Sequence, residues 1–256
     1  MVDVSEIVVI GQRPWHWPDT GLPPGSIAFQ DGYYGIWKYL PDGNANPDYP
    51  SEPTTDPVIK WSIDPNTPES QALALKLGNT LVGVLRAALA TPDQATITTS
   101  AGTMTGAQLR GTITAITNNP IRVVYNGDIP GAPGLPNDAA VVWENGQPHM
   151  YVTPSLLASG HYGDDAAFPN NSGMNFVVLH EMAHTFTPVQ QQWNSQIGAY
   201  YARTGASDQS QMWATDSQGE LIHVEARIVE QYANNAAISV ANYFGLPVYT
   251  TPKYGS

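Results

Sequence analysis

The hydrophobic positions after Thr67 follow a helical repeat that continues as far as Pro92. Thr67 is a favourable N-cap and Pro68 a favourable first helical residue, because a threonine hydroxyl accepts an amide hydrogen there and proline needs no partner for its nitrogen. The pattern therefore predicts a long helix from residue 68 to residue 91. Its apolar face consists of Leu73, Leu77, Leu81, Val84, Leu85 and Ala88.

A second helix and three strands are predicted further along the chain. Residues 105–117 carry leucine and isoleucine on one helical face, and residues 121–125 have the β-branched and aromatic character of a strand. Residues 140–144 and 149–153 flank Asn145-Gly146, the dipeptide best suited to a tight hairpin turn. The pattern after residue 67 is therefore that of a mixed helix-and-strand domain.

The chain before residue 67 has a different composition. Eleven of the 22 prolines and four of the seven tryptophans lie before residue 70. Proline at this density disfavours long helices and interior strands, and the aromatic content is too high for a disordered linker. We therefore expect residues 1–66 to form an extended arm that packs its aromatic side chains onto a domain formed by residues 67–256.

Charge and cysteine content narrow the classes of partner and ligand. Ten Lys and Arg against 22 Asp and Glu give a net charge of −12, which argues against nucleic acid or an anionic membrane as partner. The chain has no cysteine, so any metal must be held by histidine and carboxylate.

The sequence also lacks the usual targeting patterns. No apolar run approaches 18 residues and the first residues lack a basic segment, which predicts neither a membrane span nor a signal peptide. We expect a protein that is cytoplasmic as synthesised or exported by another route.

The segment with the clearest chemical meaning is His180-Glu181-Met182-Ala183-His184, which follows an apolar run. Residues four apart lie on one face of a helix, so two imidazoles at this spacing can bind one Zn²⁺. Glu181 can then reach a water on the metal and act as general base. The alternative is two surface histidines that flank a salt-bridging glutamate. The spacing favours a zinc-peptidase site.

The order of predicted elements, together with HExxH, resembles the zincin metallopeptidases. This resemblance implies an α+β fold with a small mixed sheet, the HExxH helix and a second helix that carries a ligand. In zincins an edge strand pairs with an extended protein or peptide substrate, and residues 149–153 occupy the place of that strand. The metzincin branch requires Gly and His where this chain has Thr187 and Gln190. The aspartate-ligand branch requires a Gly-Thr-x-x-Asp signature, which this chain lacks. The glutamate-ligand branch, the gluzincins, remains.

The third ligand is expected on a helix predicted from residue 216 to residue 244, with Gly245 as its stop. On a helical projection Glu225 falls in the apolar half, whereas Glu230, His223 and Asn234 share the flank beside it. The run Glu230-Gln-Tyr-Ala-Asn234 is similar to a gluzincin signature, Glu-x-x-Ala followed by Asp, Asn or Glu. The resemblance implies Glu230 as third ligand and Asn234 as the residue that orients a ligand histidine. Glu225 is the alternative ligand, and Glu220 and Asp216 are weaker ones.

The layout is most similar to the lethal-factor and Pro-Pro endopeptidase group. In that group a tyrosine seven residues before the glutamate stabilises the oxyanion; here His223 stands at that position, and an imidazole can donate the same hydrogen bond. Substitutes for this role are Tyr200, Tyr201 and Tyr232.

The implied function is that of a zinc-dependent endopeptidase, with a bacterial effector or toxin domain as one setting. The alternatives are an inert zincin-shaped binding or structural module, and an enzyme kept latent by residues 1–66.

Overall fold

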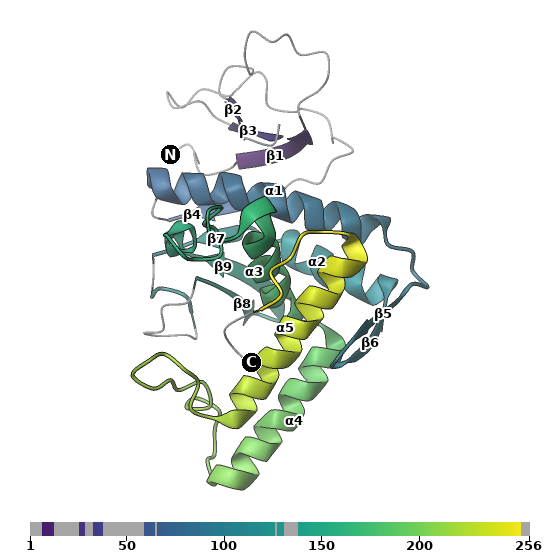
Figure 1. The fold of residues 1–256 in the computed structure, drawn as a ribbon, viewed down its shortest axis with the longest axis vertical. Helices are drawn as coiled ribbons and strands as arrows, with labels where there is room; N and C mark the ends of the chain where they lie inside the picture. Colours follow the sequence, from purple (N-terminus) through teal and green to yellow (C-terminus); the bar gives the residue numbers. More distant parts are fainter. Residues whose placement is uncertain are drawn as a thin grey trace.

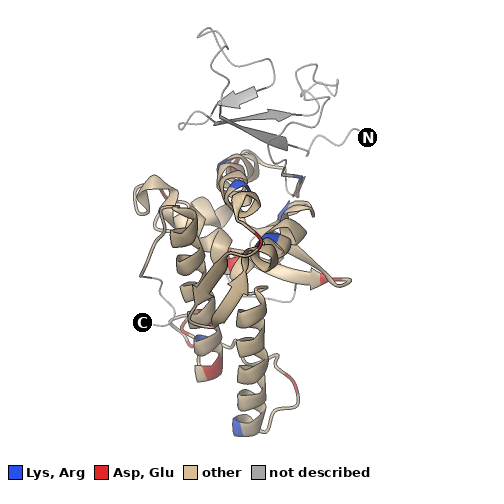
Figure 2. Cartoon of the chain, turned by 90° about the vertical axis from the view of Figure 1, so that its right-hand side faces the viewer, with Lys and Arg blue, Asp and Glu red and all other residues tan. Residues whose placement is uncertain are grey.

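The structure is a computed structural model with a mixed α/β architecture (Figure 1). It describes five α-helices and a small mixed sheet. The described residues are 59–64, 66–125, 127–130 and 138–251, together with the backbone of three earlier strands. Figure 2 shows how few Lys, Arg, Asp and Glu residues the described chain carries, in keeping with a charged content of 12%.

The long helix α1 (Pro68–Ala90) begins where the sequence predicts it. The Thr67 hydroxyl accepts the amide hydrogen of Ser70 and so caps the first turn. Among the described residues, α1 alone is long and apolar enough to cross a membrane, but 56% of its most apolar window is buried inside the molecule. A buried core helix passes the same test, and α1 supplies one wall of the main hydrophobic core.

The central sheet has the strand order β4-β7-β9-β8. Its strands are β4 (Trp61–Ile63), β7 (Ile121–Val123), β8 (Ala139–Glu144) and β9 (Gln147–Val152). β4, β7 and β9 are parallel, and β8 joins β9 antiparallel. The prediction that residues 149–153 form the edge strand is therefore wrong. β9 returns to the middle of the sheet to pair with β7, and this leaves β8 at the edge.

The turn between β8 and β9 is the predicted Asn-Gly hairpin. Asn145 has φ 49° and Gly146 has φ 75°, so both central residues lie in the left-handed region that a type I′ turn requires. The turn therefore closes the hairpin with no intervening loop, and Glu144 lies directly opposite Gln147.

The sheet also includes chain from the segment predicted as an arm. Ile59, Trp61 and Ile63 are buried in the main core, because β4 pairs with β7. Further back, β1 (Ile7–Gln12), β2 (Ser26–Ala28) and β3 (Tyr33–Trp37) form an antiparallel sheet in the order β1-β3-β2. Apart from Trp61, the aromatic side chains of the predicted arm lie outside the described part of the chain.

The second predicted helix, α2 (Gly106–Thr117), starts with a capping box between Thr105 and Gln108. A small hairpin of β5 (Thr96–Thr99) and β6 (Gly102–Thr105) precedes it. After the sheet, the 3₁₀ helices η1 (Pro154–Leu157) and η2 (Pro169–Asn171) lead to α3 (Ser172–Ala183). The loop before α3 is packed closely onto its start, because a Cβ on Gly173 would lie 2.3 Å from the carbonyl oxygen of Tyr162.

The last two helices are α4 (Thr187–Thr204) and α5 (Val224–Phe244), which lie side by side in Figure 1. α5 also packs along α3, and Ala233, Ala237 and Ala241 are fully buried in the core that the two helices share. The predicted helix from residue 216 begins eight residues too early. The Asp216 carboxylate accepts the amides of Gln218 and Glu220 and so stabilises a turn there instead of a helix.

Candidate metal centre

Two helices bring the candidate ligands together. α3 carries His180 in its last turn and His184 at its C-cap, and their Nε2 atoms are 3.2 Å apart. Glu230 reaches across from α5: its Oε2 lies 3.1 Å from Nε2 of His180 and 3.6 Å from Nε2 of His184. All three side chains are partly buried, with 11–14% of each exposed. The described residues thus contain one compact His-His-Glu group.

The spacing of these three atoms fits one small metal ion. Tetrahedral ligands about 2.0–2.1 Å from a zinc ion lie roughly 3.3–3.4 Å from one another. The three distances of 3.1, 3.2 and 3.6 Å bracket that value. The chain has no cysteine, so its metal ligands must be histidine and carboxylate, and this group supplies two imidazole nitrogens and one carboxylate oxygen. The group could therefore hold a divalent cation.

Glu181 lies beside this group and outside the triangle of ligand atoms. Its Oε1 is 3.9 Å from Nε2 of His180, and 13% of its side chain is exposed. A backbone hydrogen bond from Val141 in β8 reaches its carboxylate. Burial raises the pKa of Glu181 to about 7; the neighbouring Glu230 carboxylate adds to the rise and His180 opposes it.

The pKa of Glu230 shifts in the opposite direction although its side chain is about as buried, because its carboxylate lies closer to the histidines. Burial by itself would raise the pKa of Glu230, but attraction to His184 and hydrogen bonds from His180 and His184 more than offset this. The pKa of Glu230 is therefore held far below its ordinary value. One carboxylate of the site stays ionised, while the other titrates near neutral pH in the metal-free protein.

The two histidine rings are held mainly by aromatic neighbours. The Phe176 ring lies 5.6 Å from the ring of His180, and the Trp193 ring lies 5.6 Å from that of His184 at 86°. Neither Nδ1 atom has a hydrogen-bond partner among the described residues. Sequence reasoning missed both aromatic contacts. Phe176 could have been found, since it lies four residues before His180 on α3, whereas Trp193 comes from another helix.

Asn234 is buried one turn after Glu230, where the sequence places it. Its hydrogen bond to a ligand histidine stays a prediction, and the Nδ1 atoms of His180 and His184 have no partner among the described residues. A contact on the other side of the site was not predicted. The side-chain amide of Gln190 donates to the carbonyl oxygen of His184, which ties the end of α3 to the start of α4.

Glu225, the alternative ligand, faces away from the histidines. Both of its carboxylate oxygens bind Arg203 of α4, and only 5% of its side chain is exposed. The hydrogen bond from Arg203 lowers the pKa of Glu225 more than burial raises it. Of the two weaker alternatives, Asp216 caps its own turn and Glu220 is exposed. Glu230 is the glutamate that reaches the histidines.

His223 is not placed as the helical repeat predicts, because α5 begins at Val224 and His223 is its N-cap with an extended backbone. Its Nδ1 lies 3.2 Å from an Arg203 nitrogen, and its ring meets that of Tyr200 at 5.0 Å. These contacts belong to the junction of α4 and α5. None of the interactions described for His223 joins it to the metal group, so its role as oxyanion donor stays a prediction.

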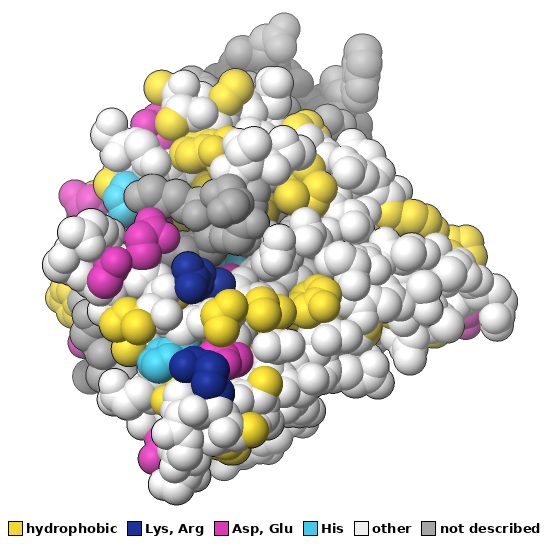
Figure 3. All heavy atoms as spheres, turned by 60° about the horizontal axis from the view of Figure 1, so that its bottom comes forward, with side chains coloured by type: hydrophobic (Ala, Val, Ile, Leu, Met, Phe, Trp, Pro, Cys, Tyr) yellow, Lys and Arg dark blue, Asp and Glu magenta, His cyan; other side chains and the backbone are white. Residues whose placement is uncertain are grey.

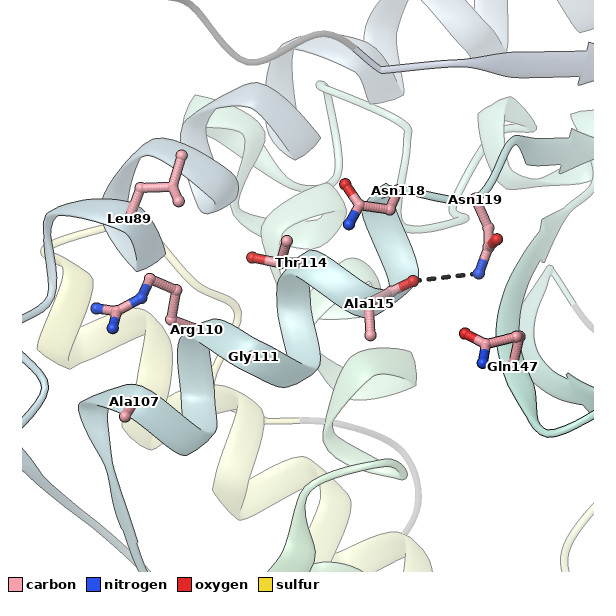
Figure 4. Close-up of a pocket in the computed structure, with 9 residues that line it drawn as sticks. All are labelled: Leu89, Ala107, Arg110, Gly111, Thr114, Ala115, Asn118, Asn119 and Gln147. Carbon is pink, nitrogen blue, oxygen red and sulfur yellow. Dashed lines mark hydrogen bonds between the residues drawn. The ribbon is translucent and has the colours of Figure 1, made fainter.

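Two further features of the molecular surface lie outside the metal group. On the face in Figure 3, charged and histidine side chains gather on one half, and the other half is mostly uncharged. A separate hollow of about 680 Å³ lies along α2 (Figure 4). It contains none of the candidate ligands. It is lined by Leu89, Ala107, Arg110, Gly111, Thr114, Ala115, Asn118, Asn119 and Gln147.

Comparison of the chain with family models, with curated proteins and with solved structures found no match. The fold is a mixed α/β domain, and the site is a His-His-Glu group beside a buried glutamate.

Proposed function

We propose that this protein is a zinc-dependent endopeptidase of the gluzincin type. The observation that carries the proposal is the convergence of His180, His184 and Glu230 at distances suited to one zinc ion. Glu181 stands next to this group without joining it, which is the arrangement that a general base requires. An inert module would have no need for the buried carboxylate of Glu181, which is unfavourable in the absence of a partner charge.

The side chains divide the chemistry between them. Zinc bound by the three ligands would supply a polarised water and a Lewis acid for the scissile carbonyl. Glu230 remains ionised and contributes the one negative charge among the ligands, since its pKa is strongly lowered. Glu181 accepts the proton of the attacking water and returns it to the leaving amine. A carboxylate buried beside a cation is suited to both transfers, because the cation favours its ionised form in the resting site.

The edge strand β8 is the proposed docking site for an extended peptide. In a two-residue hairpin the residues next to the turn, here Glu144 and Gln147, form a hydrogen-bonded pair. The pairing alternates along the strand, so the backbone groups of Ala139, Val141 and Trp143 point to the free edge. A substrate strand can pair with these groups, apart from the Val141 amide, which binds Glu181, as in β-strand addition. The proposed substrate is therefore a protein or peptide in extended form.

The test of this proposal joins metal content with peptide cleavage. The purified protein should contain about one zinc per chain and should cleave an unfolded protein such as casein. Glu181→Gln should keep the zinc and lose cleavage by several orders of magnitude, because the amide cannot accept the proton. A zinc-loaded protein that cleaves no peptide would indicate the inert module instead. Near-normal cleavage by Glu181→Gln would exclude Glu181 as general base.

A further inference from the structure

The backbone of β8 makes a direct contact with the proposed general base. A hydrogen bond from the Val141 amide reaches the Glu181 carboxylate. The register of the hairpin independently assigns this amide to the free edge, because Glu144 pairs with Gln147 and the pairing alternates from there. Val141 lies opposite Met150, which is fully buried, and α3 packs beside β8. The donor is therefore part of a fixed strand.

This contact bears on why Glu181 is not a fourth ligand. Its carboxylate oxygen lies 3.9 Å from Nε2 of His180, whereas the Glu230 oxygen lies at 3.1 Å. A glutamate side chain has three rotatable bonds and can swing its carboxylate by more than this difference. A hydrogen-bond donor is therefore needed to hold the Glu181 carboxylate beside the three ligand atoms. Among the described residues, the Val141 amide is the hydrogen-bond donor that reaches it from outside the triangle.

We propose that the backbone amide of Val141 is a positioning group for Glu181. It holds the carboxylate at the edge strand, within reach of the attacking water and outside the metal's ligand set. The inference rests on the proposed function for its catalytic consequence, but the contact can be tested without it. The contact also links two parts of the site, because β8, the proposed docking strand for the peptide, positions the general base Glu181.

The direction of this amide makes a selective substitution possible. Proline removes a backbone donor, and in a strand it is tolerated where that donor faces a free edge. Val141→Pro therefore removes the hydrogen bond to Glu181 and leaves the β8–β9 hydrogen bonds in place. A second variant replaces Val141 by its α-hydroxy analogue, which converts the amide to an ester and keeps the side chain.

The expected result is a loss of kcat with little change in KM or zinc content. Displacement of a catalytic group by about 1 Å reduces the rate by up to roughly 100-fold, so both Val141 variants should lose about 10- to 100-fold in kcat. In a Glu181→Gln background the Val141 changes should have no further effect on the residual rate. If both Val141 variants keep kcat within about twofold, the proposal is wrong.

Amide hydrogen exchange tests the contact in the metal-free protein, independently of any activity. Val141 should exchange more slowly than Trp143, although both amides face the free edge. Glu181→Ala should accelerate exchange at Val141 by about tenfold or more and leave Trp143 unchanged. An unaltered Val141 rate would overturn the positioning role. If the Val141 amide exchanges slowly but the protein has no peptidase activity, the hydrogen bond to Glu181 is supported and only the proposed function is excluded.

Discussion

Arg203 binds both carboxylate oxygens of Glu225, at 2.6 Å and 2.7 Å, across the junction between α4 and α5. This pair explains why a carboxylate can occupy the apolar half of α5, where an unpaired charge would be strongly unfavourable. It also explains why Glu225 does not serve the metal centre, since its oxygens are already bound on the other side of the helix. The two glutamates of α5 thus have separate partners.

Glu225→Gln should therefore reduce stability and leave metal binding intact. The substitution removes the charge that pairs with Arg203, and we expect the free energy of unfolding to fall by about 1–3 kcal/mol, a range reduced because half of Arg203 is exposed to solvent. Chemical denaturation should show this loss, and metal analysis of the same preparation should still find about one zinc per chain. Loss of zinc at unchanged stability would transfer the ligand role to Glu225.

The contribution of the Glu225–Arg203 pair to the free energy of unfolding should decrease in acid. The pKa of Glu225 in the folded protein is lowered, so the pair contributes stability above the unfolded carboxylate pKa of about 4.3. This contribution is lost as the pH falls through the lower folded-state pKa. The difference in unfolding free energy between the parent and Glu225→Gln should accordingly be constant near neutral pH and shrink in acid. A difference that grows as the pH falls would contradict the lowered pKa.

Glu230→Ala should abolish stoichiometric zinc binding with little effect on the fold. The change removes the one anionic ligand and leaves two imidazoles, which bind a divalent cation far more weakly. Circular dichroism should be close to that of the parent, because alanine favours a helix at this position of α5. Glu225→Gln serves as the matched control on the same helix. Full zinc occupancy in Glu230→Ala would show that the third ligand lies elsewhere.

The metal-free protein should lose stability as the pH rises toward neutrality because of Glu181. Its folded-state pKa of about 7 is above the unfolded value of about 4.3, so its contribution is fully present below pH 4.3 and is lost as the pH rises through 7. Metal-free Glu181→Gln lacks this titration and should be more stable than the metal-free parent at pH 8, by an amount of the order of 2–4 kcal/mol. The two proteins should converge near pH 4. Parallel stability curves across this range would show that the pKa of Glu181 is not raised.

Zinc binding should weaken in mild acid. An imidazole must be neutral to donate its lone pair, so protons compete with zinc and the apparent zinc affinity should fall as the pH is lowered. Competition with a chelating dye between pH 8 and pH 5 measures this dependence. With two histidine ligands the affinity should fall by up to about 100-fold per pH unit at the acid end. An affinity that is independent of pH over this range would exclude His180 and His184 as ligands.

The parts of the fold that local sequence determines were predicted well. Thr67 and Thr105 cap helices where the sequence places them, and Asn145 and Gly146 form the expected turn. Each of these features depends on a few consecutive residues, because a cap or a two-residue turn is stabilised by hydrogen bonds within that segment. The start of α5 was missed for a related reason: the Asp216 side chain competes locally for the amides that a helix would have used.

The sequence by itself determined that His180 and His184 would face one side of a helix, since a spacing of four residues suffices for that. The tertiary structure decided which glutamate meets them. Glu225 and Glu230 lie on one helix, and only the placement of Arg203 on α4 and of the histidines on α3 separates their roles. It also decided that β8 is the edge strand, because the pairing of β9 with β7 joins segments far apart in the chain. Such contacts depend on how whole elements pack, and no short stretch of sequence encodes them.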